Sequence, residues 1–133
     1  MNALEKDLIR YRLARAREAL DEARYNFNGG RLNVCVGRIY YACFYAVSAL
    51  LLCKGLSAHR HAGVRALFHR ELAKPGLVSP AASEFYDELL EERLHADYGD
   101  YVVFEPAQVK DWLDKAPGFL DEIEKAADQF LKS

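Results

Sequence analysis

Cysteine is scarce in this sequence, and its three copies form no Cys-x-x-Cys pair. An odd count without such a pair is not the pattern of a disulfide-stabilised secreted domain. All three, Cys35, Cys43 and Cys53, fall in the most apolar stretch of the chain. A free cysteine in such a stretch behaves as a small core residue. We therefore expect reduced thiols and a cytoplasmic location.

The sequence also lacks an excess of one charge, since 18 basic and 20 acidic residues leave a net charge of −2. Any nucleic-acid site must then be a local patch rather than a field of the whole molecule. Residues 1–7 lack the apolar core of a signal peptide. The longest stretch with few polar side chains, residues 39–53, is shorter than the ~20 residues that cross a bilayer. We expect no membrane segment.

Several motifs of nucleotide and hydrolytic chemistry are absent as well. The chain contains no GxxxxGK(S/T) or GxGxxG loop, which cradle nucleotide phosphates, and no HExxH or GxSxG signature. Nucleotide chemistry by any of these routes is excluded. We expect neither a cofactor nor a resident metal ion.

The sequence does contain strong helical periodicity. Apolar residues make up 51% of the 133 residues, which suits one domain with its own core. They recur about every 3.6 residues in segments separated by glycine and proline. We predict an all-α fold, a four- to five-helix up-and-down antiparallel bundle that forms a single domain over residues 1–133. The predicted helices lie at about residues 2–27, 32–54, 61–73, 80–98 and 106–130.

Three details of these helices are specific enough to test. The apolar stripe of the first helix includes Leu4, Leu8 and Tyr11, and that of the fourth ends at Leu94. Pro117 lies inside the last helix, where a missing N–H predicts a kink or a break. Residues 101–104 form a short extended piece.

A polar run at the end of the fourth helix is the first candidate site. Arg93 and Asp97 are four residues apart, so they project from one helical face, which continues an apolar stripe. Such a pair is either an ion pair that closes the bundle or the floor of a polar cleft. More polar side chains gather around it than one ion pair needs, namely His95, Tyr98, Asp100 and Tyr101.

The second helix carries a matching group. Arg38, Tyr41 and Tyr45 share a helical face at spacing i, i+3 and i+7. An arginine in a core helix is costly unless a carboxylate or a phosphate meets it, and Asp97 is the expected partner. The tyrosines alternatively pack in the core with their hydroxyl groups at its rim.

The third helix offers a basic stripe. If the helix begins near His61, then His61, Arg65 and His69 lie on one face. A zinc site would use the histidines, but cysteine or carboxylate ligands at the usual spacing are missing. A phosphate site would use Arg65 together with Arg60 and Arg70. A solvated basic face is the third alternative.

Four motifs in register resemble the HEPN domain family. They are Arg38-x-Tyr-Tyr-Ala-x-Phe-Tyr45, Ala49-Leu-Leu51, His61-x-Gly-Val64 and Arg93-x3-Asp-Tyr98, and the similarity covers about residues 3–130. The resemblance implies a helical bundle that pairs as a homodimer with a cleft between protomers. It also implies a minimal nucleotidyltransferase as partner in a toxin–antitoxin system, and in many members a metal-independent ribonuclease.

The family's ribonuclease motif is an arginine followed after four to six residues by a histidine. By resemblance Arg93 is the motif arginine, and Asp97 and Tyr98 match the Asp-Tyr of one branch. No histidine stands at the expected distance, because His95 follows Arg93 by only two residues. A histidine from elsewhere, His61, His69 or His95, would have to replace it in space.

Three hypotheses result. The first is a cleft for RNA or a nucleotide, with Arg93 and Asp97 as the catalytic candidates; its binding residues would be Arg38, Tyr41, His61, Arg65 and Tyr98. The second is an active metal-independent ribonuclease toxin. The third is a non-catalytic structural or dimerisation module, in which the same charges form a buried network.

Overall fold

The computed structural model describes residues 1–99 and 102–132, except for the Tyr98 side chain, and the described part is helical without strands. Its elements in chain order are α1 (Ala3–Asn28), α2 (Leu32–Cys53), α3 (His61–Leu67), the π-helical turn η1 (Phe68–Ala73), α4 (Pro80–Tyr98) and α5 (Pro106–Leu131). The predicted all-α bundle is confirmed, and each predicted helix is present within a few residues of its expected bounds.

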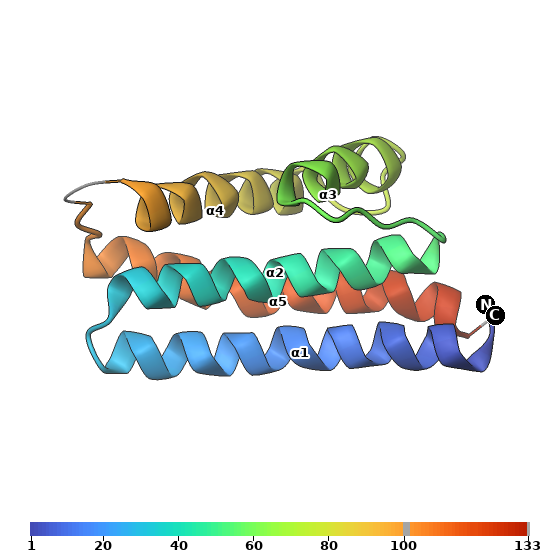
Figure 1. Ribbon diagram of the computed structural model, residues 1–133, viewed down its shortest axis with the longest axis horizontal. Helices are drawn as coiled ribbons and strands as arrows, with labels where there is room; N and C mark the ends of the chain where they lie inside the picture. The colour runs from blue at the N-terminus through green and yellow to red at the C-terminus, as the bar shows by residue number, and fades with distance from the viewer. Residues whose placement is uncertain (100–101, 133) are drawn as a thin grey trace.

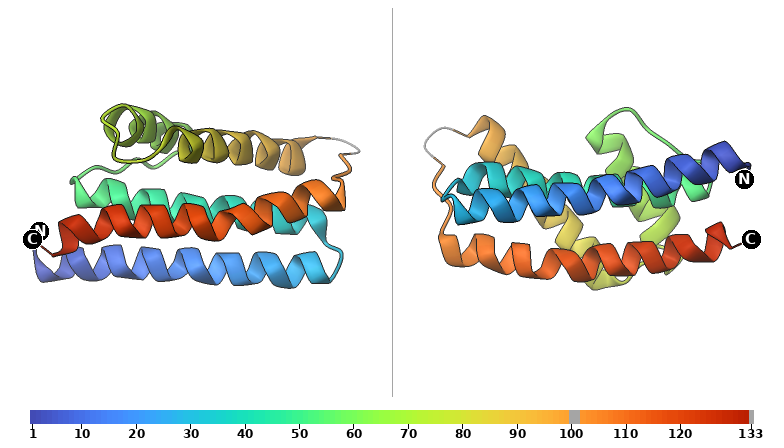
Figure 2. Two further views of the ribbon diagram at one scale, coloured as in Figure 1. Left: turned by 180° about the vertical axis from the view of Figure 1, so that it is seen from behind. Right: turned by 90° about the horizontal axis from the view of Figure 1, so that it is seen from below.

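Helix α2 is the centre of the bundle. It packs against α1, α4 and α5, and its end also contacts α3 and η1. Figure 1 shows α1 on one side of α2 and α4 with α3 on the other, while α5 runs alongside α2. Both chain ends lie at the same end of the bundle (Figure 2). The candidate site lies on the side of α2 that faces α3 and α4.

The length and composition of α2 would also suit a membrane span. Within the described residues it is the one such helix, and 61% of its most apolar window is buried inside the bundle. The core helix of a bundle that is not in a membrane has the same properties. Neighbouring helices therefore account for its apolar character.

The third predicted helix contains an irregularity that periodicity did not reveal. It begins at His61 as expected, but Phe68–Ala73 winds as a π-helix, and the amide of Lys74 donates to the carbonyl of His69 (2.9 Å). A wider turn adds a residue and rotates the next residues of the helix about its axis. Phe68 and Leu72 are both buried in this arrangement. Core packing thus selects a winding that sequence spacing alone does not indicate.

Two further expectations did not hold in full. Of the kink or break expected at Pro117, the break is wrong, because helix α5 is continuous from Pro106 to Leu131. Trp112, Leu113, Phe119 and Leu120, on either side of Pro117, are buried in the core. The apolar stripe of α1 also divides: Ile9 is buried, whereas Leu4 is 80% and Tyr11 61% exposed. Leu8 and Leu94 are exposed too.

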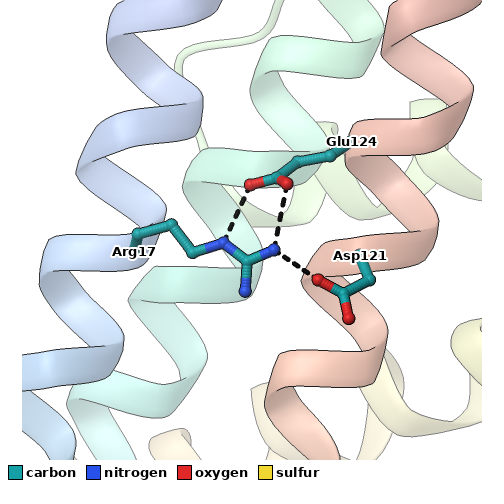
Figure 3. A network of polar contacts seen from close by, with 3 residues as sticks. All are labelled: Arg17, Asp121 and Glu124. Carbon is teal, nitrogen blue, oxygen red and sulfur yellow. Dashed lines mark hydrogen bonds and ion pairs between the residues drawn. The ribbon is translucent and has the colours of Figure 1, made fainter.

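A charged network joins α1 to α5 across the bundle. Arg17 donates through Nε and Nη2 to the two carboxylate oxygens of Glu124, both at 2.9 Å, and through Nη2 also to Asp121. Figure 3 shows the guanidinium between these two carboxylates. A bidentate pair of this kind has a fixed geometry that an ordinary surface pair lacks. It ties the first helix to the last.

We expect Arg17→Met to lower the free energy of unfolding by about 1 kcal/mol, because Arg17 is only 36% exposed and its pair is bidentate. For a chain of this size the melting temperature falls by about 3–5 °C. Thermal melting followed by circular dichroism measures the shift. Arg24→Met is the matched control, since Arg24 pairs only with Asp21 on its own helix. Equal shifts in the two variants would contradict a bridge between the helices.

Candidate functional site

Three elements meet at the candidate site. Helix α2 contributes Tyr40 and Tyr41, α3 begins there with His61, and the last turns of α4 contribute Arg93 and Asp97. The aromatic part of α2 positions the charges, because Tyr40 packs in the core while Tyr41 reaches its rim. The site is therefore attached to the central helix of the bundle.

Arg93 lies against two neighbouring aromatic rings, whose centres are 5.5 Å apart and which pack edge to face. Its guanidinium carbon is 5.4 Å from the ring centre of Tyr40 and 5.1 Å from that of Tyr41. Nη2 donates to the Tyr41 hydroxyl (3.1 Å), and only 12% of the side chain is exposed. Stacking and hydrogen bonding together fix the plane of the guanidinium. Among the described residues Nη1 makes no hydrogen bond, so this nitrogen can bind an incoming anion.

Asp97 provides the counter-charge. Its Oδ2 is 3.0 Å from Arg93 Nε, which confirms that the two side chains share a helical face. The approach is that of an ion pair; Nε is not directed at the carboxylate as a hydrogen-bond donor. Because Asp97 is 40% exposed, it can turn towards solvent when another anion binds Arg93.

His61 is the histidine that the structure brings to this arginine. Its Nδ1 is 2.8 Å from the Tyr40 hydroxyl, and its ring centre is 4.6 Å from that of Phe44. Burial lowers the pKa of His61 below the ordinary 6.5, the charge of Arg93 lowers it further, and Asp97 acts in the opposite direction. His61 is therefore neutral at neutral pH. Its Nε2 has no hydrogen-bond partner among the described residues and can exchange a proton.

Tyr40 holds the ring of His61 in place. Burial raises the pKa of Tyr40 to about 12, so the phenol keeps its proton at neutral pH. The ring of Tyr40 also stacks on that of Tyr86, which is fully buried. Sequence reasoning missed this role, although the Tyr-Tyr pair of α2 places both rings next to Arg93.

Arg38 does not meet its expected partner. Its Nη1 lies 3.7 Å from Glu22 of α1, and its guanidinium stacks on the Tyr41 ring at 4.8 Å. The predicted Arg38–Asp97 pair is wrong, because Asp97 already faces Arg93 and Arg38 points towards α1. The shared face of Arg38, Tyr41 and Tyr45 is confirmed, with Tyr41 and Tyr45 rings 6.0 Å apart.

The basic stripe of α3 divides between two places. His61 joins the site, whereas Arg65 and His69 both contact Asp87 of α4, at 2.9 and 2.8 Å, and Arg65 also pairs with Glu91. Acidic neighbours thus neutralise Arg65, which no described contact links to Arg93. Asp87 and Glu91, four residues apart on α4, were the signal that sequence reasoning overlooked.

The remaining candidates lie away from the site or outside the described part. His95 is 3.9 Å from Glu92 and strongly exposed, so it lies off the Arg93 face as its spacing predicts. The side chain of Tyr98 and residues 100 and 101 are outside the described residues. Where the structure describes the chain, no three histidine, cysteine or acidic side chains gather as metal ligands.

Comparison with known proteins identifies the family of the chain. The model of the HEPN domain family matches residues 9–126. The chain belongs to the HEPN domain family. The resemblance seen in the sequence motifs is thus confirmed.

Three curated proteins illustrate what this HEPN domain is similar to. A "UPF0332 protein" of Thermotoga maritima is 50% identical over 133 residues and covers all of both chains. A protein of Methanocaldococcus jannaschii named "Putative toxin MJ0142" is 29% identical over 113 residues, which are 85% of this chain and 77% of that protein. A "UPF0332 protein" of Gloeobacter violaceus is 34% identical over 87 residues, 65% of this chain and 67% of that one.

Proposed function

We propose that this HEPN domain binds the phosphate groups of RNA or of a nucleotide at Arg93. The observation that carries the proposal is the guanidinium held against both Tyr40 and Tyr41 and hydrogen-bonded to the Tyr41 hydroxyl, with Nη1 unused by described residues. A planar guanidinium held in this way matches the geometry of phosphate oxygens. The neighbouring Arg38, whose guanidinium lies over the Tyr41 ring, adds a second positive charge near Arg93.

In the same proposal the chain is the toxin-like half of a two-protein system. The M. jannaschii relative is named as a toxin, which supports this role. The partner we propose is a minimal nucleotidyltransferase, as the resemblance of the motifs implies. Free, buried cysteines are in keeping with a cytoplasmic location.

One observation favours a second candidate function, a metal-independent ribonuclease. His61 supplies, from another helix, the histidine missing after Arg93. Neutral His61 Nε2 would take the proton of a 2'-hydroxyl, whose oxygen then attacks the adjacent phosphorus. Arg93 would stabilise the charge on the phosphate. The bond between phosphorus and the 5'-oxygen breaks, the leaving oxygen takes a proton from water, and the products would be a 2',3'-cyclic phosphate and a 5'-hydroxyl.

The test is an assay of the purified chain, without a partner protein, on single-stranded RNA in the presence of EDTA. If the proposed function is right, we expect the wild-type chain to bind the RNA and the variant Arg93→Ala not to bind it. Cleavage in EDTA would add the ribonuclease activity. The proposal would be contradicted if the wild-type chain bound neither RNA nor nucleotides.

We also propose that two copies pair through the exposed apolar stripe of α1. Leu4, Leu8 and Tyr11 lie on one face of this helix, and apolar surface of this kind marks interaction sites. We expect Leu8→Lys to shift the chain from dimer to monomer, because a buried lysine would lack a partner. Light scattering after size-exclusion chromatography measures the mass. The control is Leu94→Lys on α4; a variant at Leu8 that stays dimeric would place the contact elsewhere.

A further inference from the structure

A separate pocket of about 300 Å³ opens beside the site, between α1, α2 and the segment that leads into α3. Figure 1 shows this segment leaving the end of α2 and passing back to α3. The volume is at the lower end of the range for small-molecule sites, which suits one nucleotide unit rather than a larger ligand.

The residues that line the pocket indicate the kind of ligand it would bind, namely one with an anionic group next to a flat apolar group. Phe44, Leu51 and Val64 form apolar walls, and none of the described lining residues is acidic. The lining also contains side chains that can form hydrogen bonds: Tyr45, Ser48, Ser57 and His59. This combination of apolar and hydrogen-bonding groups fits a nucleobase, whose faces are apolar and whose edges donate and accept hydrogen bonds.

Arg12 provides the charge of the pocket. It is half-buried and has no hydrogen bond or ion pair with any residue that the structure describes. Most other arginines of α1 do have carboxylate partners, for example Arg15 with Glu18 and Arg17 with Glu124. A partly desolvated guanidinium without a counter-ion is well placed to bind a phosphate.

The pocket and the Arg93 site share a wall. Phe44 lines the pocket, and its ring centre is 4.6 Å from that of His61, which belongs to the site. Tyr45 lines the pocket as well, 6.0 Å from the ring of Tyr41. The guanidinium carbon of Arg15 on α1, which pairs with Glu18, is 5.3 Å from the centre of the Tyr45 ring. One RNA strand can therefore occupy both the pocket and the Arg93 site, with aromatic rings lying between Arg12 and Arg93.

We infer that the pocket is a second nucleotide subsite for single-stranded RNA, with a base against Phe44 and a phosphate at Arg12. The inference rests on the proposed function, because the adjoining phosphate would lie at Arg93. Single strands are required, since in a duplex the bases are stacked and paired and cannot enter a pocket. Alternating aromatic and basic contacts are how proteins hold single strands with little sequence preference.

The test is a titration of a fluorescent 2'-O-methyl RNA hexanucleotide, which cannot be cleaved by 2'-hydroxyl attack, followed by anisotropy. We expect Arg12→Gln and Ser48→Phe, which fills the pocket, each to weaken binding about tenfold. Loss of one phosphate contact should also reduce the salt slope of log K by about 0.7 in Arg12→Gln. The matched control is Arg10→Gln, which removes an exposed charge from the same helix and should change binding less than twofold.

The outcomes separate the two proposals. Should Arg12→Gln behave like Arg10→Gln in affinity and salt slope while Arg93→Ala still abolishes binding, the pocket is not a subsite and the proposed function stands. Arg93→Ala with wild-type affinity would instead overturn the proposed function. Equal binding of a blunt RNA duplex would overturn the requirement for a single strand. If Ser48→Phe does not fold, Arg12→Gln and its salt slope decide, because Arg12 lies at the helix surface.

Discussion

Replacing Arg93 by lysine should weaken RNA binding by about 10- to 100-fold, although the charge is kept. Lysine has no planar guanidinium to place against Tyr40 and Tyr41, and it offers no fork of donors to a phosphate. A hydrogen bond to a charged group contributes about 1.5–3 kcal/mol, which corresponds to this range of affinity. Anisotropy titration of single-stranded RNA measures the change. Arg70→Lys, at an exposed position of η1, is the control with the same exchange.

The structural alternative makes a different forecast for the same cluster. If Arg93 and Asp97 were only a buried network, Asp97→Ala would cost about 3–5 kcal/mol of stability. Asp97 is 40% exposed, so we expect a loss nearer the roughly 0.2–1 kcal/mol of surface pairs. A large fall in the melting temperature of Asp97→Ala, together with unchanged RNA binding by Arg93→Lys, would favour the structural module.

The fold was largely predictable because its signals are local. Apolar spacing defined the helices, and their ends carry recognisable residues: Asn2 caps α1 in a capping box with Glu5, and Ser79 followed by Pro80 begins α4. Gly30, at a positive φ of 76°, lies in the turn after α1. The π-helical turn escaped prediction because it arises from packing between η1 and the core rather than from spacing.

The site was predictable only within single helices. Spacing placed Arg93 beside Asp97 and Arg38 beside Tyr41, and both neighbourhoods are confirmed. Which helix faces which is a property of the whole bundle, so spacing could not show that Arg38 turns to Glu22. For the same reason sequence reasoning could not choose among three histidines. The fold chooses His61, because α3 starts against the Tyr40 side of α2.

His61 is therefore the second residue, after Arg93, whose replacement should have a large effect, in this case on RNA cleavage. If the domain cleaves RNA, His61→Ala should lower the cleavage rate by about 100-fold or more, which is the usual contribution of a general acid or base. Binding should change much less, because Arg93 keeps its contacts with Tyr41 and Asp97. The matched control is His95→Ala, since His95 lies near in sequence but off the Arg93 face.

The pH dependence gives a separate check on the role of His61. Burial and the charge of Arg93 lower the pKa of His61. A cleavage rate that needs neutral His61 should therefore fall only at a pH below the ordinary pKa range of histidine. In Asp97→Asn the opposing effect of Asp97 on this pKa is lost, so the acid limb should move to still lower pH. The free energy of unfolding depends on pH in the same direction. Because the unfolded chain binds a proton at His61 more readily than the folded chain does, the contribution of neutral His61 to stability is complete above about pH 6.5 and is lost as the pH falls.

Single-turnover cleavage rates measured over a range of pH, with enzyme in excess over RNA, would show both the limb and its movement. A profile that is unchanged in Asp97→Asn, or wild-type cleavage by His61→Ala, would remove His61 from the reaction and leave Arg93 as a binding residue. Tyr40→Phe adds a test of positioning, because it removes the 2.8 Å contact with Nδ1 and leaves the ring in place. We expect it to lower the cleavage rate without weakening the binding of RNA.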